Sequence, residues 1–218
     1  MNDKQLQKDI LAELDWEPFV NPAHIGVSVD HGVVTLTGHV TSFAEKHAAA
    51  EAVRRVRGVR ALVQDMHVQL TDPLWPDDAD IATAAVARLS WRTGIPAEAI
   101  KVSVENGGVM LTGQVENHGQ REIAAAEVRD IPGVRMVVNA LTLRPAVVSP
   151  ADVQQRIEAA LRRNALIDAG QVAVMVADGV VTLTGTVHSL YEREAAAWAA
   201  WSAPGTREVL NELAVAGD

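Results

Sequence analysis

The sequence predicts an α+β protein made of three tandem copies of one small domain. The main observation is a glycine-bounded pattern of seven residues that occurs at 32–38, 107–113 and 179–185. With an offset of 75 residues to the second copy and 147 to the third, the units align without a gap from this pattern to their ends. Self-similarity at a fixed period indicates repeated structural units, so we expect three domains rather than one or two.

Each pattern starts at a two-residue turn between two alternating apolar segments. The turns are His31-Gly32, Asn106-Gly107 and Asp178-Gly179. Asn-Gly and Asp-Gly are the strongest local signals for a type I′ hairpin, because both turn residues need positive φ. Counting outwards from the second turn places Val104 opposite Val109 and Val102 opposite Leu111. A slip of one residue would turn this apolar face to water, so we expect a well-specified hairpin with an architectural role.

A helix precedes each hairpin. In the first unit it is expected over residues 3–16, with Leu6, Ile10, Leu11 and Leu14 on one apolar stripe. The stripe recurs with Ile81, Ala85, Val86 and Leu89, and then with Val153, Ile157 and Leu161, where Glu158 stands at its edge. Proline at the first helical position favours a helix start at Ser149-Pro150.

A second helix and a last strand follow each hairpin. Capping pairs mark the helix starts: Ser42 with Glu45, Asn117 with Gln120, and Ser189 with Glu192. The alanine-rich helices are expected to stop at Gly58, Gly133 and Gly205, because glycine readily takes the left-handed conformation that closes a helix. Each unit therefore has the order helix, strand, strand, helix, strand. We expect the domains to span 1–72, 73–147 and 148–218, with short proline-containing linkers.

Composition narrows the function classes. The chain has 218 residues, 48% of them hydrophobic and 22% charged, with a net charge of −9 that is spread evenly over the three units. Nucleic-acid binding needs a clustered basic footprint, so it is not expected. The local exception is a group of arginines near the end of the second helix: Arg54, Arg55, Arg57 and Arg60. They suit either a solvated helix end, whose dipole favours cations, or a small site for phosphate or lipid headgroups.

We expect no catalytic residue, metal site or cofactor. The chain has no cysteine, and five of its seven histidines lie in the first unit at positions where the other units carry different residue types. These are His24, His31, His39, His47 and His67, which we expect on the surface or in turns. Neither HExxH nor CxxC spacing is present, and the glycine pairs lie inside a hairpin rather than between a strand and a helix.

The start of the sequence shows no charged segment followed by an apolar one, and no apolar run approaches the length of a membrane-spanning helix. As written, the chain is expected to be cytoplasmic, or periplasmic if it is a processed or truncated form.

The differences between units suggest where a partner binds. On the outward face of the second helix, the third unit has Trp198 and Trp201 where the first has Glu51 and Arg54. Tryptophan favours sites with one wet and one apolar end. Packing against a neighbouring repeat or a second copy, insertion into a membrane surface, and a small-molecule or peptide groove are all compatible with this pair. Trp16 and Trp91 hold equivalent positions after the first helix, and their repetition predicts packing in or near the core.

An arginine also recurs just after each helix-ending glycine, as Arg60, Arg135 and Arg207. Such a residue could fix the turn through a salt bridge or a carbonyl contact, or it could bind a headgroup.

The chain resembles three tandem BON domains, a family named for bacterial osmotically inducible and nodulation proteins. The resemblance rests on the glycine-bounded hairpins, the helix-ending glycines, and the closing patterns 138–141 and 210–213. It implies two helices packed on one face of a three-stranded mixed sheet, and binding rather than catalysis. It also implies phospholipid or membrane-surface binding linked to osmotic or envelope stress. The alternatives are a soluble interaction scaffold or dimer, and a sensor of monovalent cations such as potassium.

Overall fold

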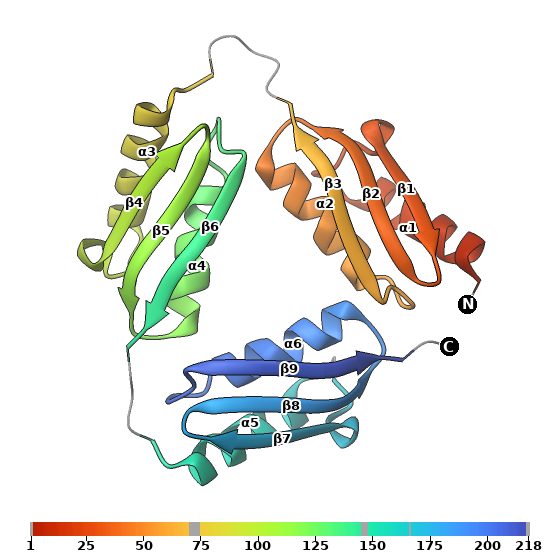
Figure 1. The fold of residues 1–218 in the computed structure, drawn as a ribbon, viewed down its shortest axis with the longest axis vertical. Coiled ribbons are helices and arrows are strands. Elements are labelled where there is room, and N and C mark those ends of the chain that lie inside the picture. Colours follow the sequence, from red (N-terminus) through yellow and green to blue (C-terminus); the bar gives the residue numbers. More distant parts are fainter. Residues whose placement is uncertain (1, 70–74, 145–147, 166, 217–218) are drawn as a thin grey trace. The chain divides into compact units, whose positions relative to one another are not determined.

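The computed structural model describes residues 2–69, 75–144, 148–165 and 167–216, and shows three repeats of the same α+β unit (Figure 1). The helices and strands of repeat 1 are α1 (Asp3–Trp16), β1 (Ile25–Asp30), β2 (Val33–Val40), α2 (Phe43–Arg55) and β3 (Ala61–Val68). Those of repeat 2 are α3 (Asp78–Trp91), β4 (Ile100–Glu105), β5 (Gly108–Val115), α4 (His118–Arg129) and β6 (Met136–Leu143). Those of repeat 3 are α5 (Pro150–Arg163), β7 (Val172–Ala177), β8 (Val180–Val187), α6 (Leu190–Trp201) and β9 (Glu208–Val215).

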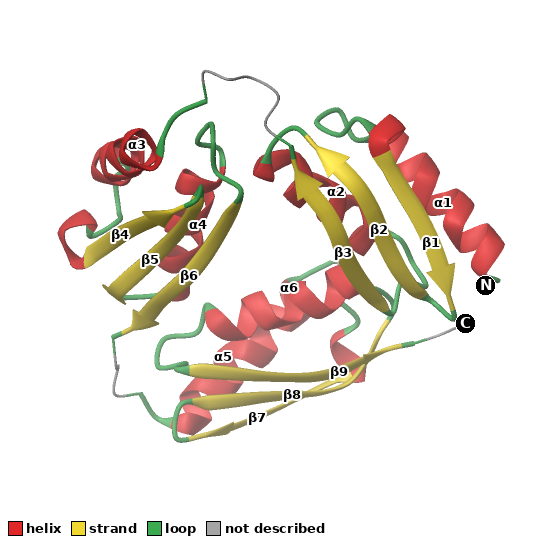
Figure 2. Cartoon of the chain, turned by 45° about the horizontal axis from the view of Figure 1, so that its top comes forward, coloured by secondary structure: helices red, strands yellow, loops and turns green. Residues whose placement is uncertain are grey.

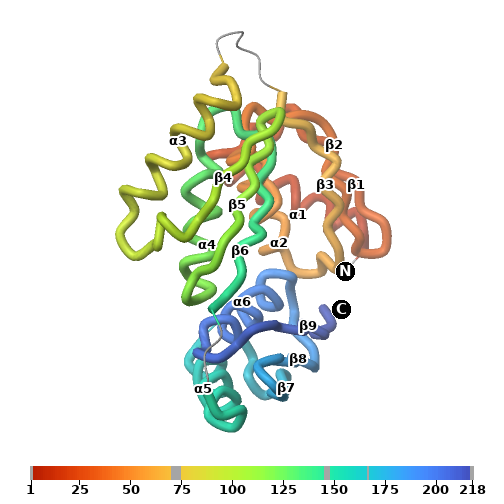
Figure 3. Tube along the Cα trace, turned by 60° about the vertical axis from the view of Figure 1, so that its left-hand side comes forward, coloured from red at the N-terminus to blue at the C-terminus, as the bar shows by residue number. Residues whose placement is uncertain are grey.

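Each repeat is a two-layer structure, as predicted. Its sheet has the order first, second, third strand, and Figure 2 shows both helices on one face of the sheet. The first two strands pair antiparallel, whereas β6 runs parallel to β5 and β9 parallel to β8. The helix between the parallel strands makes this crossover possible. The path of each repeat can be followed along the trace in Figure 3.

The predicted hairpins are confirmed in conformation and in register. The first turn residues have φ of 49°, 51° and 49°, and the glycines that follow have φ of 79°, 76° and 78°, as a type I′ turn requires. Val104 pairs with Val109 and Val102 with Leu111. Val109 and Leu111 are buried beneath the helices, so the hairpin supplies one side of the repeat's core.

A short 3-10 turn that the sequence analysis did not predict precedes the first strand of every repeat. These turns are Pro22–His24, Ala97–Ala99 and Ala169–Gln171. These turns explain why the repeated pattern ends in glycine in every repeat. A Cβ added to Gly113, whose φ is 131°, would lie 2.0 Å from the carbonyl oxygen of Ala99, and the corresponding distances at Gly38 and Gly185 are 2.1 and 1.9 Å. Only glycine lets the strand pass this carbonyl.

The predicted caps of the second helices are present, with one difference. The backbone N–H of Gln120 donates to Asn117 Oδ1 at 2.9 Å, as the capping pair requires. The Gln120 side chain, however, accepts from the N–H of Glu116, one residue before the cap, at 2.9 Å. The same shifted bond joins Glu45 to Thr41 and Glu192 to His188. In each repeat, the pair still satisfies two backbone donors at the helix start.

The prediction that these helices stop at Gly58, Gly133 and Gly205 needs correction. The helices end at Arg55, Arg129 and Trp201, and each glycine lies three or four residues further on, with φ near 90°. A short turn intervenes, in which the N–H of Val134 donates to Ile131 O at 3.1 Å. Both of these residues are buried, so the turn extends the core beyond the helix end.

The first helices occupy the predicted ranges, but their apolar stripe is narrower than predicted. Leu6, Ile10 and Leu14 are buried in α1, whereas Leu11 is exposed, and so is Val86 at the same position of α3. The buried stripe therefore follows a spacing of four residues alone, and the position next to it is exposed as Leu11 and Val86 and half-buried as Glu158.

Within the described residues, no helix is long and apolar enough to cross a membrane.

Candidate functional site

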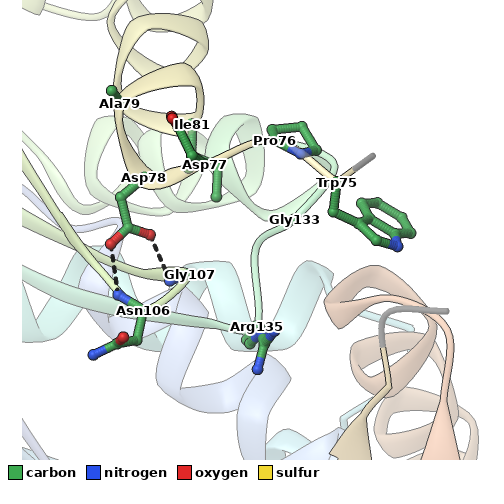
Figure 4. A pocket seen from close by; sticks show the side chains of 10 residues that line it. All are labelled: Trp75, Pro76, Asp77, Asp78, Ala79, Ile81, Asn106, Gly107, Gly133 and Arg135. Carbon is green, nitrogen blue, oxygen red and sulfur yellow. Dashed lines mark hydrogen bonds between the residues drawn. The ribbon is translucent and has the colours of Figure 1, made fainter. Parts of the chain in front are cut away.

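The hairpin turn of repeat 2 is held by a carboxylate from the start of α3. Asp78 accepts hydrogen bonds from the backbone N–H groups of Asn106 and Gly107, at 2.8 and 2.9 Å (Figure 4). In repeat 1, Asp3 accepts from His31 and Gly32 at 2.8 and 3.2 Å. Repeat 3 has Pro150 at this position, so its turn lacks the carboxylate. The first helix and the hairpin are thus joined by a charged hydrogen-bond pair in two of the three repeats.

The recurring arginine packs against the other side of this turn. The N–H of Arg135 donates to Gly107 O at 2.8 Å. A Cβ on Gly107 would lie 2.7 Å from Gly133 O and 3.1 Å from Arg135 Cγ, so the arginine stem covers the turn closely. Arg60 and Arg207 make the same backbone bond, and the Arg207 guanidinium also donates to the carbonyl of Asp178. The backbone bond is available to any residue with an N–H group, so the contacts specific to arginine are the stem packing on the turn and, in repeat 3, the guanidinium bond to Asp178.

A surface cavity of about 590 Å³ lies beside the turn of repeat 2 (Figure 4). Its lining comprises Trp75, Pro76, Asp77, Asp78, Ala79, Ile81, Asn106, Gly107, Gly133 and Arg135. Asp78 bonds to the turn, and Asp77 caps α3 by accepting from the N–H of Asp80 at 2.9 Å. Among these ten described lining residues there is no serine, cysteine or histidine, so the cavity carries no nucleophile with an adjacent imidazole base.

Two members of the arginine group of repeat 1, Arg54 and Arg55, form ion pairs. Arg54 lies 2.6 Å from Glu51 on the same helix. Arg55 reaches Glu13 through Nε at 3.1 Å and Glu17 through Nη2 at 2.8 Å, and the hydrogen bond to Glu17 is the main reason that its pKa is raised. Arg57 and Arg60 are exposed at the surface. Two of the four predicted headgroup contacts therefore already pair with carboxylates of their own repeat.

The predicted tryptophan pair lies on the last turns of α6. Trp198 is 47% exposed and Trp201 is half-buried, while Ala196 and Ala200 of the same helix are buried against the sheet. The pair thus lies outside the core of its own repeat, as the pattern predicts.

The prediction that Trp16 and Trp91 pack in or near the core is wrong. Trp16 is 83% exposed and Trp91 is 87% exposed. The reason is the helical period: at 3.6 residues per turn, a residue two positions after the buried Leu14 lies about 200° around the helix from it. The helical period, counted from the buried residues, predicts that both indoles point outwards. The recurrence of tryptophan at this position was wrongly interpreted as a sign of burial. In repeat 3 the position holds Arg163, which is also exposed.

The C-terminal ends of α1 and α3, which carry Trp16 and Trp91, differ in charge. Residues 9–20 of repeat 1 include four acidic residues and no basic one, whereas residues 84–95 of repeat 2 include Arg88 and Arg92 and no acidic one. The second helix contributes an ion-pair partner to each end, which is Arg55 for Glu13 in repeat 1 and Glu127 for Arg92 in repeat 2. The aromatic side chain is thus common to both ends, but one end is acidic and the other is basic.

A comparison with protein-family models matches the BON domain three times, over residues 2–69, 77–145 and 149–217. Among curated proteins, osmotically-inducible protein Y of Escherichia coli K12 is 27% identical over 145 residues, which is 65% of this chain and 72% of that protein. Two solved structures of CdsD, a structural protein of the type III secretion system of Chlamydia trachomatis, share 15% identity with the chain, with TM-scores of 0.28 and 0.29. They cover 99% and 98% of this chain, and 100% and 93% of their own.

Proposed function

Because the chain belongs to the BON domain family, we propose that it is a non-enzymatic protein that binds phospholipid membrane surfaces as part of a response to osmotic or envelope stress. The similarity to an osmotically inducible protein supports the stress-related part of this proposal. The matched ranges support 1–72, 73–147 and 148–218 as the limits of the three domains.

The observation that carries the membrane proposal is Trp91. Its indole is 87% exposed at the end of α3, between Arg88 and Arg92 in the last turn and cap of the helix. An exposed tryptophan next to arginines is the combination that membrane interfaces favour, since the ring enters the headgroup layer and the cations attract anionic lipid.

Both arginines are already oriented by the second helix. Arg92 Nε lies 3.2 Å from Glu127 Oε1, and Arg88 Nη1 donates to the carbonyl of Glu127 at 3.3 Å. The Arg92 side chain is still 53% exposed, so it can contact a headgroup without breaking the core. With one carboxylate opposite two guanidinium groups, this helix end keeps a net positive charge.

One tryptophan gives only weak attachment. Removing about 150–250 Å² of aromatic surface from water contributes roughly 4–6 kcal/mol at most, before the costs of association. Trp198 and Trp201 of α6 offer a second anchor, and two linked weak sites reinforce each other when both can engage. The net charge of −9 opposes the approach to anionic vesicles, so we expect only a modest preference for anionic lipid.

The test is flotation of the full chain with phosphatidylcholine vesicles and with vesicles containing phosphatidylglycerol, at low and high salt. The wild type should float, Trp91→Ala should float at least tenfold less, and Trp198→Ala/Trp201→Ala should be intermediate. Trp16→Ala is the matched control, since it removes an equally exposed indole from the acidic helix end and should float like the wild type. Failure of the wild type to float, or equal flotation of Trp91→Ala, would overturn the proposal.

A further inference from the structure

The end of α1 in repeat 1 has two of the most exposed aromatic side chains of the described residues. Trp16 is 83% exposed and Phe19, three residues later, is 80% exposed. A surface cavity of about 610 Å³ is lined by Trp16, together with Glu13, Glu17, Pro18 and Arg55. Exposed apolar side chains that lie close together and are rimmed by polar residues are typical of interaction surfaces.

We infer that this acidic aromatic end binds a cationic, amphipathic segment of a partner protein. The first step of the argument is charge. Asp9, Glu13, Asp15 and Glu17 fall within residues 9–20, where no basic residue occurs. Arg55 of α2 pairs with Glu13 and Glu17, and Lys8 precedes Asp9 on α1, so the four carboxylates still outnumber these two cations. Complementary charge speeds association and excludes partners of the wrong sign.

The second step is the way in which α1 already holds a guanidinium group. Arg55 bridges Glu13 and Glu17, which lie one helical turn apart, with contacts of 3.1 and 2.8 Å. The spacing of these carboxylates therefore suits arginine, with its several donors in a fixed plane. Asp15 remains for a cation of a partner, and Asp9 keeps its charge while it accepts a hydrogen bond from Gln5 Nε2 at 2.7 Å. The indole of Trp16 and the ring of Phe19 offer cation–π contacts and apolar area.

The third step excludes the other occupants. A membrane surface is disfavoured because four carboxylates would approach the negative leaflet together. A second copy of the chain is disfavoured because each molecule carries a net charge of −9. The equivalent end of repeat 2 keeps the tryptophan but has arginines in place of the acids, so the ligand of repeat 1 differs from the one proposed for Trp91.

The test uses the full chain and a synthetic 15-residue peptide with arginine and leucine at helical spacing. Calorimetric titration should show binding that weakens at least fivefold between 50 and 300 mM salt, in the sense expected for an electrostatic contact. Two control peptides, one with glutamate for arginine and one with serine for leucine, should bind at least tenfold more weakly. Circular dichroism of each protein variant checks that the fold is kept.

The variants separate this surface from general acidity. Trp16→Ala/Phe19→Ala and Asp9→Asn/Asp15→Asn should each weaken peptide binding at least fivefold. Trp91→Ala is the matched control and should leave the affinity unchanged. The inference is overturned if the peptide does not bind, if Trp91→Ala weakens it as much as Trp16→Ala/Phe19→Ala, or if Trp16→Ala/Phe19→Ala abolishes vesicle flotation instead.

Discussion

Replacing Gly113 by alanine should unfold repeat 2 at much lower denaturant concentrations. The added Cβ would lie 2.0 Å from the carbonyl oxygen of Ala99, and the residue would keep a φ of 131°, which side chains rarely adopt. The unusual backbone conformation costs about 1–3 kcal/mol. Moving the backbone to relieve the overlap costs about another 1–3 kcal/mol. The sum is comparable with the roughly 3–10 kcal/mol that stabilises a domain of this size.

Gly94→Ala is the matched control, because Gly94 also has a positive φ, 90°, but an added Cβ would meet no atom within 4 Å. This control measures the free-energy cost of a positive φ without any steric overlap. Hydrogen exchange measured by mass spectrometry on the full chain resolves each repeat. Core amides of repeat 2 should exchange about 100-fold faster in Gly113→Ala, corresponding to about 3 kcal/mol. Equal exchange in the two variants would refute the argument that the carbonyl of Ala99 requires this glycine.

Three further predictions concern local interactions. Asp78→Ala should lower the free energy of unfolding of repeat 2 by about 1–2 kcal/mol in urea titrations, because two charged hydrogen bonds to the turn are lost. The control Asp80→Asn keeps both bonds to the turn and should lower this free energy by less. Ser189→Ala should cost repeat 3 about 1 kcal/mol and Ser189→Gly only a few tenths, as expected of a cap; equal losses would count against a capping role. His118→Leu should reduce the loss of stability that repeat 2 undergoes on acidification, measured as the change in the urea midpoint between pH 7 and pH 4.

The last of these follows from the burial of His118, which is 8% exposed. Burial, with a smaller contribution from Arg121, lowers its pKa to about 4 from an ordinary 6.5. The folded repeat thus keeps the imidazole neutral, while the unfolded chain takes up a proton below pH 6.5. The stabilisation is complete above pH 6.5 and is lost as the pH falls towards 4, by roughly 3 kcal/mol in total. An unchanged slope in His118→Leu would contradict this assignment. Repeats 1 and 3 have Phe43 and Leu190 at the same position, so leucine should fit.

The fold could be predicted because its determinants are local in sequence and occur three times. The type I′ turns, the register of Val102 and Val104, and the caps at Asn117 and Ser189 depend on residues a few positions apart. The contact between Gly113 and Ala99 could not be predicted, because it depends on a 3-10 turn with no distinct sequence signal.

The candidate site was predicted less well. The Arg135 stem packs on a turn 28 residues earlier in the chain, and nothing in the spacing of these residues reveals this contact. The exposure of Trp16 and Trp91, in contrast, could have been found from the helical period. Their repetition gave no guide to burial, because a repeated fold repeats its outward positions as well as its core.

The most direct test of the proposed function records the indole N–H signals of the five tryptophans by nuclear magnetic resonance while lipid bicelles are added to the full chain. Single substitutions assign the signals. The Trp91 signal should shift and broaden at the lowest lipid concentration, followed by those of Trp198 and Trp201, while the Trp16 signal should stay in place. A Trp91 signal that does not respond to lipid, or one that responds no earlier than that of Trp16, would contradict the account.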